Sequence, residues 1–229
     1  MAIQDEIKEQ QKKTADMAWK GKVAYFWDYY KIHTGVIVIA LLLLVFFVKD
    51  IMTGNQESVF QMAIINSETQ TLNEKYEQEF GEYLGIDFQK EAVTFDNTYQ
   101  INMEGTDQLT VASSQKMVAN VQLALIDAIL APADIINYYA ENSFLSDLSM
   151  VLPKKQFDQL DAKGLIYYVV TEEGKCPIGI RAEDSWWIKE TGLYIKQQPI
   201  VTCLSNTKQQ ENFSKFVTYI ERDQLEEEQ

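Results

Sequence analysis

Acidic residues are the most numerous side chains in this chain that could do chemistry, with 34 Asp and Glu against 20 Lys and Arg. Two local pairs, Glu172–Glu173 and Glu183–Asp184, bring carboxyl groups together. Paired carboxylates can act as a general acid and a general base. Each pair follows a predicted strand, however, so we favour the alternative that these are solvated acids in turns.

Other catalytic signatures are missing. The single histidine, His33, precedes an apolar run, and residues 50–229 contain no histidine. Ser–His–Asp catalysis, Cys–His catalysis and a His-based zinc site therefore cannot be built in that region. The sequence also has no phosphate-binding glycine loop and no calcium loop of alternating acids. These observations predict a non-enzymatic protein without a cofactor or a metal site.

Two adjacent tryptophans, Trp186 and Trp187, are the strongest binding candidates. Neighbouring side chains point to opposite faces of a strand, or about 100° apart on a helix, so one core does not readily take both. We expect one of them to contact a ligand or a partner. Arg181 could pair with a carboxylate, and Tyr138 and Tyr139 offer further aromatic surface. The alternative is a core edge with a structural arginine.

One apolar run, residues 34–48, is the candidate membrane span. Its fifteen residues extend over only about 22 Å as a helix, against about 30 Å of hydrocarbon, so we include the flanking residues and place the anchor at 34–52. The alternative is the core of a cleaved signal peptide. It is disfavoured because five acids precede the run and no small-x-small cleavage site follows it.

The lysines around this run predict its orientation. Lys20, Lys22 and Lys31 precede it closely with only Asp28 to oppose them, whereas few lysines follow it. The positive-inside rule then places residues 1–33 in the cytoplasm and residues 53–222 outside a bacterial cell membrane, followed by an acidic tail at 223–229. Aromatic residues within 19–30 predict an amphipathic juxtamembrane helix, or alternatively an early start of the span.

The charge after the run limits the partners. Residues 50–229 hold 13 basic and 29 acidic side chains, a net charge of −16. Such a domain repels nucleic acid, and it suits cationic or neutral ligands or a basic protein partner. Plain solubility is the alternative explanation of the charge.

Strands and helices alternate along the outer region. Predicted strands cover 59–66, 92–102, 127–133, 165–171, 175–182 and 198–205, and predicted helices cover 72–84, 109–126, 134–142, 153–164 and 208–222. Gly85 is expected to end the first helix, and the segment before Lys175 predicts a hairpin. This order predicts an α/β fold, a mostly parallel sheet with helices on both faces.

The stretch 127–152 resembles the bacterial extracellular solute-binding proteins with a type 2 periplasmic-binding fold. The resemblance rests on a strand, helix and turn pattern, a Gly-Ile-Arg element and a polar turn before the last helix. The matching positions are Asp127, Ala140, Phe144, Leu145, Asp147, Leu148, Ile178, Gly179, Ile180, Arg181 and 206–210.

This resemblance implies an architecture like one lobe of a periplasmic binding protein, reduced in length and anchored to the membrane. In the resembling fold the strands that carry Cys176 and Cys203 are neighbours, so a disulfide between them is a candidate outside the cell. Two buried thiols are the alternative.

Two functions remain open. The first is an accessory binding or interaction subunit of a membrane complex, with a protein partner in or at the membrane, and we favour it because the second lobe is short. The second is a receptor for a small solute that serves a transporter or a sensor. A filled ligand cleft would favour the first function, and an open one the second.

Overall fold

The computed structural model describes residues 19–53, 56–69, 72–105, 107–171 and 174–225, with the backbone alone at 22–26, 28–31, 33 and 50–53. The chain divides into two compact units, Met1–Asn55 and Gln56–Gln229, and each is described by itself. Predictions for residues 1–18, for Glu172–Glu173 and for the tail at 226–229 lie outside the described residues.

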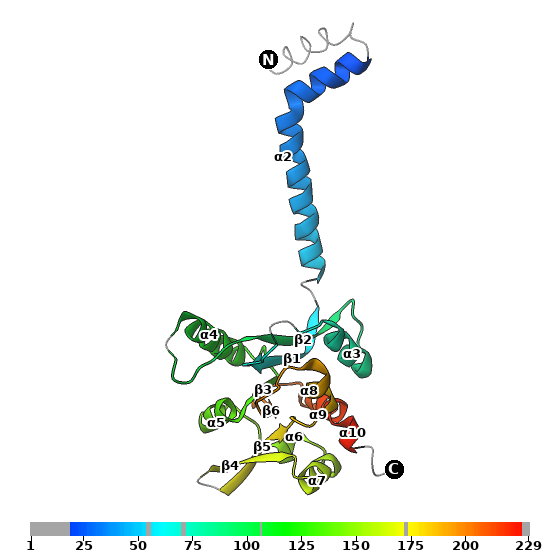
Figure 1. Ribbon diagram of the computed structural model, residues 1–229. Coiled ribbons are helices and arrows are strands. Elements are labelled where there is room, and N and C mark those ends of the chain that lie inside the picture. Colours follow the sequence, from blue (N-terminus) through cyan, green and yellow to red (C-terminus); the bar gives the residue numbers. More distant parts are fainter. Residues whose placement is uncertain (1–18, 54–55, 70–71, 106, 172–173, 226–229) are drawn as a thin grey trace. The chain divides into compact units, whose positions relative to one another are not determined.

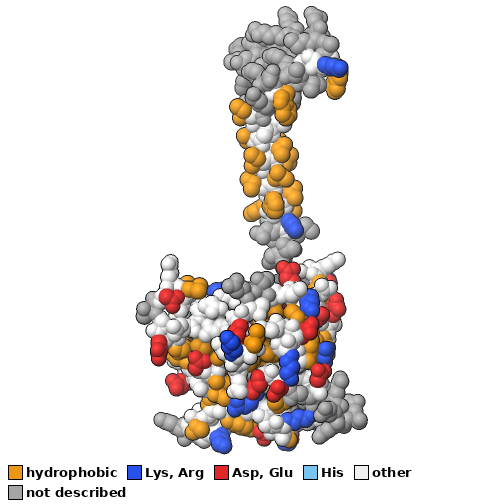
Figure 2. Space-filling view, viewed as in Figure 1, with side chains coloured by type: hydrophobic (Ala, Val, Ile, Leu, Met, Phe, Trp, Pro, Cys, Tyr) orange, Lys and Arg blue, Asp and Glu red, His pale blue; other side chains and the backbone are white. Residues whose placement is uncertain are grey.

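The described part of the first unit is one helix, α2, Trp19–Thr53. The large apolar side chains of this helix from Val36 to Val48 are 47–69% exposed. No described residue of the same unit buries them. Figure 2 shows these side chains around the helix. Within the described residues, no helix meets the combined demands of length and apolar content for crossing a membrane. The predicted juxtamembrane face includes Val23, Phe26 and Tyr30. The structure describes only the backbone of these three residues, so their side chains lie outside the described part of the chain.

The second unit is built on a six-stranded mixed sheet with helices packed against it, in the order β2-β1-β3-β6-β5-β4 (Figure 1). The strands are β1 Glu57–Ile65, β2 Glu91–Tyr99, β3 Ala128–Pro132, β4 Ile166–Thr171, β5 Gly174–Arg181 and β6 Pro199–Cys203. The helices are α3 Lys75–Leu84, α4 Gln108–Gln122, α5 Ala133–Glu141, α6 Leu148–Val151, α7 Lys154–Ala162, α8 Trp186–Thr191, α9 Gln210–Ile220 and α10 Arg222–Leu225.

The α/β class is confirmed, but the prediction of a mostly parallel sheet is wrong. Strands β2, β1 and β3 are mutually parallel, whereas β6, β5 and β4 join through antiparallel pairs. The short β4–β5 connection accounts for part of this difference, because a hairpin can join only antiparallel strands. The longer connection through α8 returns β6 antiparallel to β5 and to β3.

Helices cover both faces of the sheet, as predicted. Along β1 the side chains alternate: Phe60, Met62 and Ile64 belong to one core cluster, and Ala63 and Ile65 to the other. The first cluster packs against α3, α6, α7, α8 and α9, and the second packs against α4 and α5. Every member of both clusters lies at or beyond position 59, so this domain has a core of its own.

Local signals set several element ends. Gly85 adopts φ 73° at the end of α3, a left-handed conformation that glycine takes without steric cost. Asp107 begins α4 by accepting a hydrogen bond from the Thr110 N–H at 3.0 Å. The helix ends at Gln122, four residues before its predicted end, and Ala124 beyond it has φ 51°.

Candidate functional site

The carboxyl ends of the parallel strands are the first place to look for a ligand cleft. The chain leaves β1 through α3 to reach β2 on one side, and it reaches β3 on the other side through α4. These two helices cover opposite faces of the sheet. In open α/β sheets such a reversal leaves a crevice beyond the strand ends, and ligands bind there.

In this protein Tyr194 occupies that position. Its hydroxyl donates to the carbonyl oxygens of Ile65 at 2.6 Å and Leu130 at 3.0 Å, one at the end of β1 and the other in β3. The side chain is 5% exposed, and burial raises the pKa of its hydroxyl far above the ordinary value. The ring therefore lies where a ligand would otherwise meet these strand ends.

The segment around Tyr194 is fixed by the loop that follows β1. The Glu68 carboxylate accepts hydrogen bonds from the N–H groups of Ile195 and Lys196 at 3.0 and 2.8 Å, and these bonds lower the pKa of Glu68. The Thr69 hydroxyl donates to the Gly192 carbonyl oxygen at 2.7 Å. Within this segment Leu193 and Tyr194 are buried whereas Ile195 is 77% exposed, so it is chiefly Tyr194 that takes the place of a ligand.

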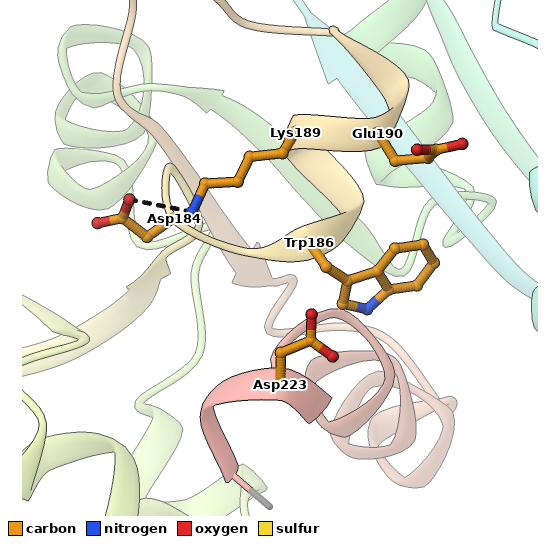
Figure 3. A pocket seen from close by; sticks show the side chains of 5 residues that line it. All are labelled: Asp184, Trp186, Lys189, Glu190 and Asp223. Carbon is orange, nitrogen blue, oxygen red and sulfur yellow. Dashed lines mark ion pairs between the residues drawn. The ribbon is translucent and has the colours of Figure 1, made fainter. Parts of the chain in front are cut away.

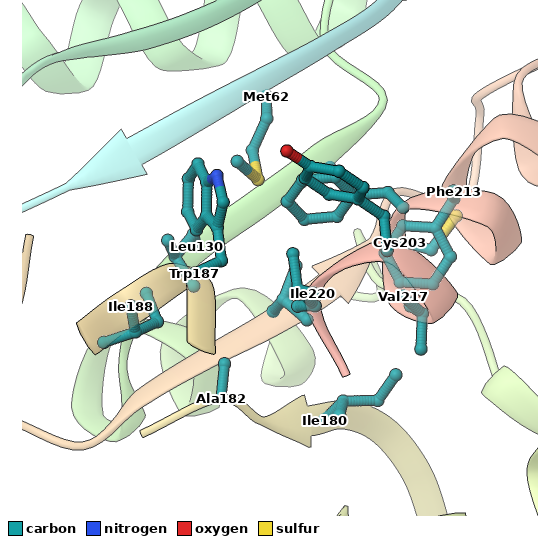
Figure 4. Packing of buried hydrophobic residues seen from close by; sticks show 14 of the residues in the cluster. Met62, Leu130, Ile180, Ala182, Trp187, Ile188, Cys203, Phe213, Val217 and Ile220 are labelled. Carbon is teal, nitrogen blue, oxygen red and sulfur yellow. The ribbon is translucent and has the colours of Figure 1, made fainter. Parts of the chain in front are cut away.

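The two adjacent tryptophans have different environments. Helix α8 begins after Ser185, whose hydroxyl accepts from the Ile188 N–H, and the helical turn sends neighbouring side chains in different directions. Trp187 is completely buried (Figure 4), with its ring centroid 5.5 Å from that of Phe95 and 5.6 Å from that of Phe216. It therefore belongs to the core and presents no surface to a ligand or a partner.

Trp186 is half-buried and remains accessible. Its indole N–H donates to the carbonyl oxygen of Tyr219 at 2.7 Å, which fixes the plane of the ring. The guanidinium carbon of Arg222 lies 3.8 Å from the ring centroid, a cation–π contact. An arginine of the chain itself thus already occupies one face of this indole.

A hollow of about 540 Å³ adjoins Trp186 (Figure 3). It is lined by Asp184, Trp186, Lys189, Glu190 and Asp223. The Lys189 ammonium lies 3.4 Å from the Asp184 carboxylate, and Figure 3 shows the Asp223 side chain directed toward the indole. A second hollow of about 630 Å³ shares Trp186 and Glu190 with the first and extends over Tyr219 and Tyr83. Trp186 therefore stands between two depressions rich in charged and aromatic groups.

Two buried carboxyl groups lie next in sequence to residues around this hollow. Glu221 is completely buried and neither of its oxygens has a hydrogen-bond partner; Oε2 of Glu183 is likewise buried and unpartnered. Burial, reinforced by the charges of Glu183 and Asp184, raises the pKa of Glu221 to about 8, while Lys189 opposes this rise. Glu183 was predicted to be a solvated acid in a turn. It is half-buried, because one of its carboxyl oxygens is shielded from solvent.

Arg181, Tyr138 and Tyr139 lie apart from Trp186. The Arg181 guanidinium sits 4.9 Å from the ring centroid of Tyr167, whose hydroxyl donates to Asn137 on α5 at 3.0 Å. Also on α5, Tyr139 is buried in the second core cluster and Tyr138 is 46% exposed. The first core cluster, against which Trp186 packs, lies on the other face of the sheet. The structure therefore divides the predicted binding residues between two faces.

No disulfide joins the two cysteines, contrary to the candidate pairing. Cys203 is buried in the first core cluster and Cys176 packs against the second, so the sheet lies between the two sulfur atoms. Burial raises the pKa of the Cys203 thiol to about 12, which keeps it protonated and unreactive.

Asp127, which is part of the solute-binding resemblance, connects neighbouring segments of the domain by hydrogen bonds. Its carboxylate accepts hydrogen bonds from the Gln61 N–H at 2.8 Å and from the Thr207 hydroxyl. It ties β1 to β3 and to the turn after β6. Among the described residues, no group of three or more His, Cys, Asp or Glu side chains is placed to hold a metal ion.

Comparisons with known proteins were made at three levels. No family model, curated protein or solved structure matches this chain. The resemblance to solute-binding proteins therefore stays a prediction, and the case for a function rests on the geometry above.

Sequence reasoning identified Trp186 but missed its partners. Arg222, Tyr219 and Glu221 lie near the end of the last predicted helix, where a charged or aromatic residue usually faces solvent. Tyr194 was missed too, because no local pattern distinguishes a tyrosine that closes a strand end from one on a surface. One local signal was available: Gly192 ends helix α8, so a connecting segment that contains Tyr194 must begin there.

Proposed function

We propose that the protein is a membrane-anchored, non-enzymatic accessory subunit that uses the domain 56–229 to bind a protein partner in or at a bacterial cell membrane. The observation that carries this proposal is the filled crevice. Because Tyr194 covers the end of β1 and bonds to the neighbouring strand β3, the usual site for a small ligand in such a sheet is taken. A receptor for a small solute would need that space.

The anchor is supported by the character of residues 34–48. Their apolar side chains surround the helix and are about half exposed or more, and a water-soluble helix normally buries such a face. The run remains short for a bilayer, about 22 Å, and packing against helices of a partner would ease this mismatch. A short span thus fits a subunit better than an isolated anchor.

The orientation follows from the lysine asymmetry, with the N-terminus in the cytoplasm and the domain outside the cell. Helix α2 ends at Thr53 and β1 begins at Glu57. We therefore infer a partner that is in the membrane or arrives at its surface.

Membrane fractionation tests the anchor. The full chain should remain in the membrane pellet after an alkaline carbonate wash, and a chain that starts at residue 56 should be soluble. Protease added outside intact spheroplasts should degrade the domain. A full chain released by carbonate, or a domain protected from external protease, would contradict the proposed location.

Co-purification tests the role. After mild crosslinking, the full chain extracted in detergent should carry a protein partner in stoichiometric amount. Recovery of the chain alone, together with stabilisation of the 56–229 domain by a sugar, amino acid or peptide in a thermal-shift panel, would instead favour the solute receptor.

A further inference from the structure

We propose that the hollow beside Trp186 binds an arginine side chain of the protein partner, with the guanidinium stacked on the indole and facing the surrounding carboxylates. This inference rests on the proposed function, and it names the chemistry of the partner at one site.

Charge around the hollow is the first argument. Three carboxylates line it, from Asp184, Glu190 and Asp223; the half-buried Glu183 precedes Asp184, and the buried Glu221 lies two residues before Asp223. Each lining carboxylate has a basic neighbour: Lys189 lies near Asp184, Arg222 near Asp223 at 3.8 Å, and Lys75 near Glu190 at 3.5 Å. All three ion pairs have exposed side chains, and such pairs are weak and exchangeable. A cation from a partner can therefore compete for these carboxylates.

The aromatic surface is the second argument. Arg222 shows that the indole accepts a guanidinium at stacking distance, and the hydrogen bond to Tyr219 holds the ring ready for it. Arg222 belongs to the short helix α10, and its Nε lies 3.8 Å from the Asp223 carboxylate, a long and exposed ion pair. An arginine of the partner that lies closer to the carboxylates of the hollow can displace Arg222 from the indole. Planar guanidinium groups stack on aromatic rings better than ammonium groups, which favours arginine over lysine.

The carboxyl group of Glu221 is the third argument. It is completely buried and unpartnered, so its ionised form is costly, and proteins offset such a cost by protonation or by supplying a cation. Lys189 and Asp184, which line the hollow, both influence the pKa of Glu221, so this group is within electrostatic range of a ligand there. Among the described residues, Glu183 before α8 also raises this pKa, and Arg222 and Asp223 on α10 follow Glu221 directly in sequence. An arriving guanidinium favours ionised Glu221, so binding should release a proton near neutral pH.

The 56–229 domain offers a direct probe, because Trp186 and Trp187 are its only tryptophans. The ligand used is a blocked Gly-Arg-Gly-Arg-Gly peptide, compared with its lysine, glutamine and glutamate counterparts. We expect the arginine peptide to change the tryptophan fluorescence in a saturable way, the lysine peptide to bind several-fold more weakly, and the other two not to bind. Titration calorimetry in buffers of different ionisation enthalpy should show proton release at pH 7.

Four variants separate this site from general attraction to an acidic domain. Trp186→Leu should weaken calorimetric binding of the arginine peptide about tenfold, as expected for loss of a desolvated cation–π contact. Arg222→Gln removes the internal competitor and should strengthen binding about threefold. Glu221→Gln should abolish proton release. Glu141→Gln, at the exposed end of α5, is the matched control and should change nothing.

The outcomes decide the inference and the proposed function separately. Equal binding by all four variants, or no binding of the arginine peptide by the wild type and by Arg222→Gln, would overturn the site. Near-ultraviolet circular dichroism confirms that each variant is folded. If the full chain with Trp186→Leu still co-purifies its partner at the wild-type level, the arginine site fails while the accessory role stands. If the wild-type chain recovers no partner, the accessory role itself fails.

Discussion

The hydroxyl of Tyr194 donates to the carbonyl oxygen of Ile65 across 2.6 Å, and it joins residues that lie 129 positions apart. The same hydroxyl lies 3.0 Å from the carbonyl oxygen of Leu130, so one side chain connects the end of β1 to the parallel strand β3. The bond links the connection after α8 to the usual ligand position in this type of sheet, and our proposal of an interaction domain in place of a solute receptor rests on it.

Removing this hydroxyl should destabilise the domain. Tyr194→Phe leaves the Ile65 and Leu130 carbonyl oxygens without their tyrosine donor, and a lost buried hydrogen bond costs about 1–3 kcal/mol of unfolding free energy. Urea denaturation of the 56–229 domain measures the change. The control is Tyr168→Phe, whose hydroxyl bonds Asp161 at an exposed position and should matter by no more than about 0.5 kcal/mol. Equal effects for the two variants would contradict the bracing role of Tyr194.

The two thiols should titrate very differently. With no reductant present, the denatured domain should react with two equivalents of an alkylating agent, because Cys176 and Cys203 are not joined. In the folded domain at pH 8, Cys203 should resist modification, since burial raises its pKa to about 12. Mass spectrometry of the alkylated peptides measures both results. Fewer than two reactive thiols after denaturation would contradict the arrangement of the cysteines on opposite faces.

Gly179 should tolerate no side chain. A Cβ atom there would collide with the Cγ2 of Ile200 on the neighbouring strand and would lie 3.2 Å from the Val201 carbonyl oxygen. Forcing an extra methyl group into a packed sheet typically costs about 1–3 kcal/mol, so Gly179→Ala should lower the urea midpoint clearly. The control is Gly164→Ala, where the space is open and only the positive φ of 71° opposes the change, a smaller cost of about 1 kcal/mol. An unchanged midpoint for Gly179→Ala would rule out this close approach.

The positions of the elements could be predicted well from the sequence, but their arrangement could not. The β1 pattern of alternating and then continuous apolar residues identifies a buried strand, and Gly85 and the β4–β5 turn mark ends that local chemistry dictates. The direction of β6 depends on how the chain returns through α8 and the segment 192–198, and no local pattern encodes that path. The same limit explains Cys176 and Cys203, which were expected on neighbouring strands but whose faces could not be assigned.

The residues of the candidate site were harder to predict from the sequence than the fold. Helical geometry predicts that one of two adjacent tryptophans is exposed, but the sequence does not say which one. Glu221 begins a charged run with Arg222 and Asp223 at the end of the last predicted helix, so it would be assigned to solvent. It is buried because tertiary packing brings it close to Glu183 and Asp184, which lie nearly forty positions earlier.

Glu221 also makes stability depend on pH with a definite sign. Its pKa is about 8 in the folded domain against an ordinary value of 4.5, so between these values the folded state binds more protons than the unfolded state. This contribution to stability is therefore present at low pH and falls as the pH rises from about 4.5 to about 8. Glu221→Gln removes the dependence. The variant should match the wild type near pH 4.5, and it should exceed it at pH 8 by a few kcal/mol, on the order of 1.4 kcal/mol for each pH unit that separates the folded and unfolded pKa values.

The difference between the two stability curves isolates this group from the other carboxyls. Asp127 and Glu77 also have raised pKa values, mainly through burial, and they contribute equally to both proteins. Urea denaturation at half-unit steps from pH 4.5 to 8.5 supplies the curves. A control variant, Glu141→Gln, should run parallel to the wild type. If the Glu221→Gln and wild-type curves are also parallel, then Glu221 is not held in its neutral form at pH 7, and the charge balance around Trp186 differs from the one described.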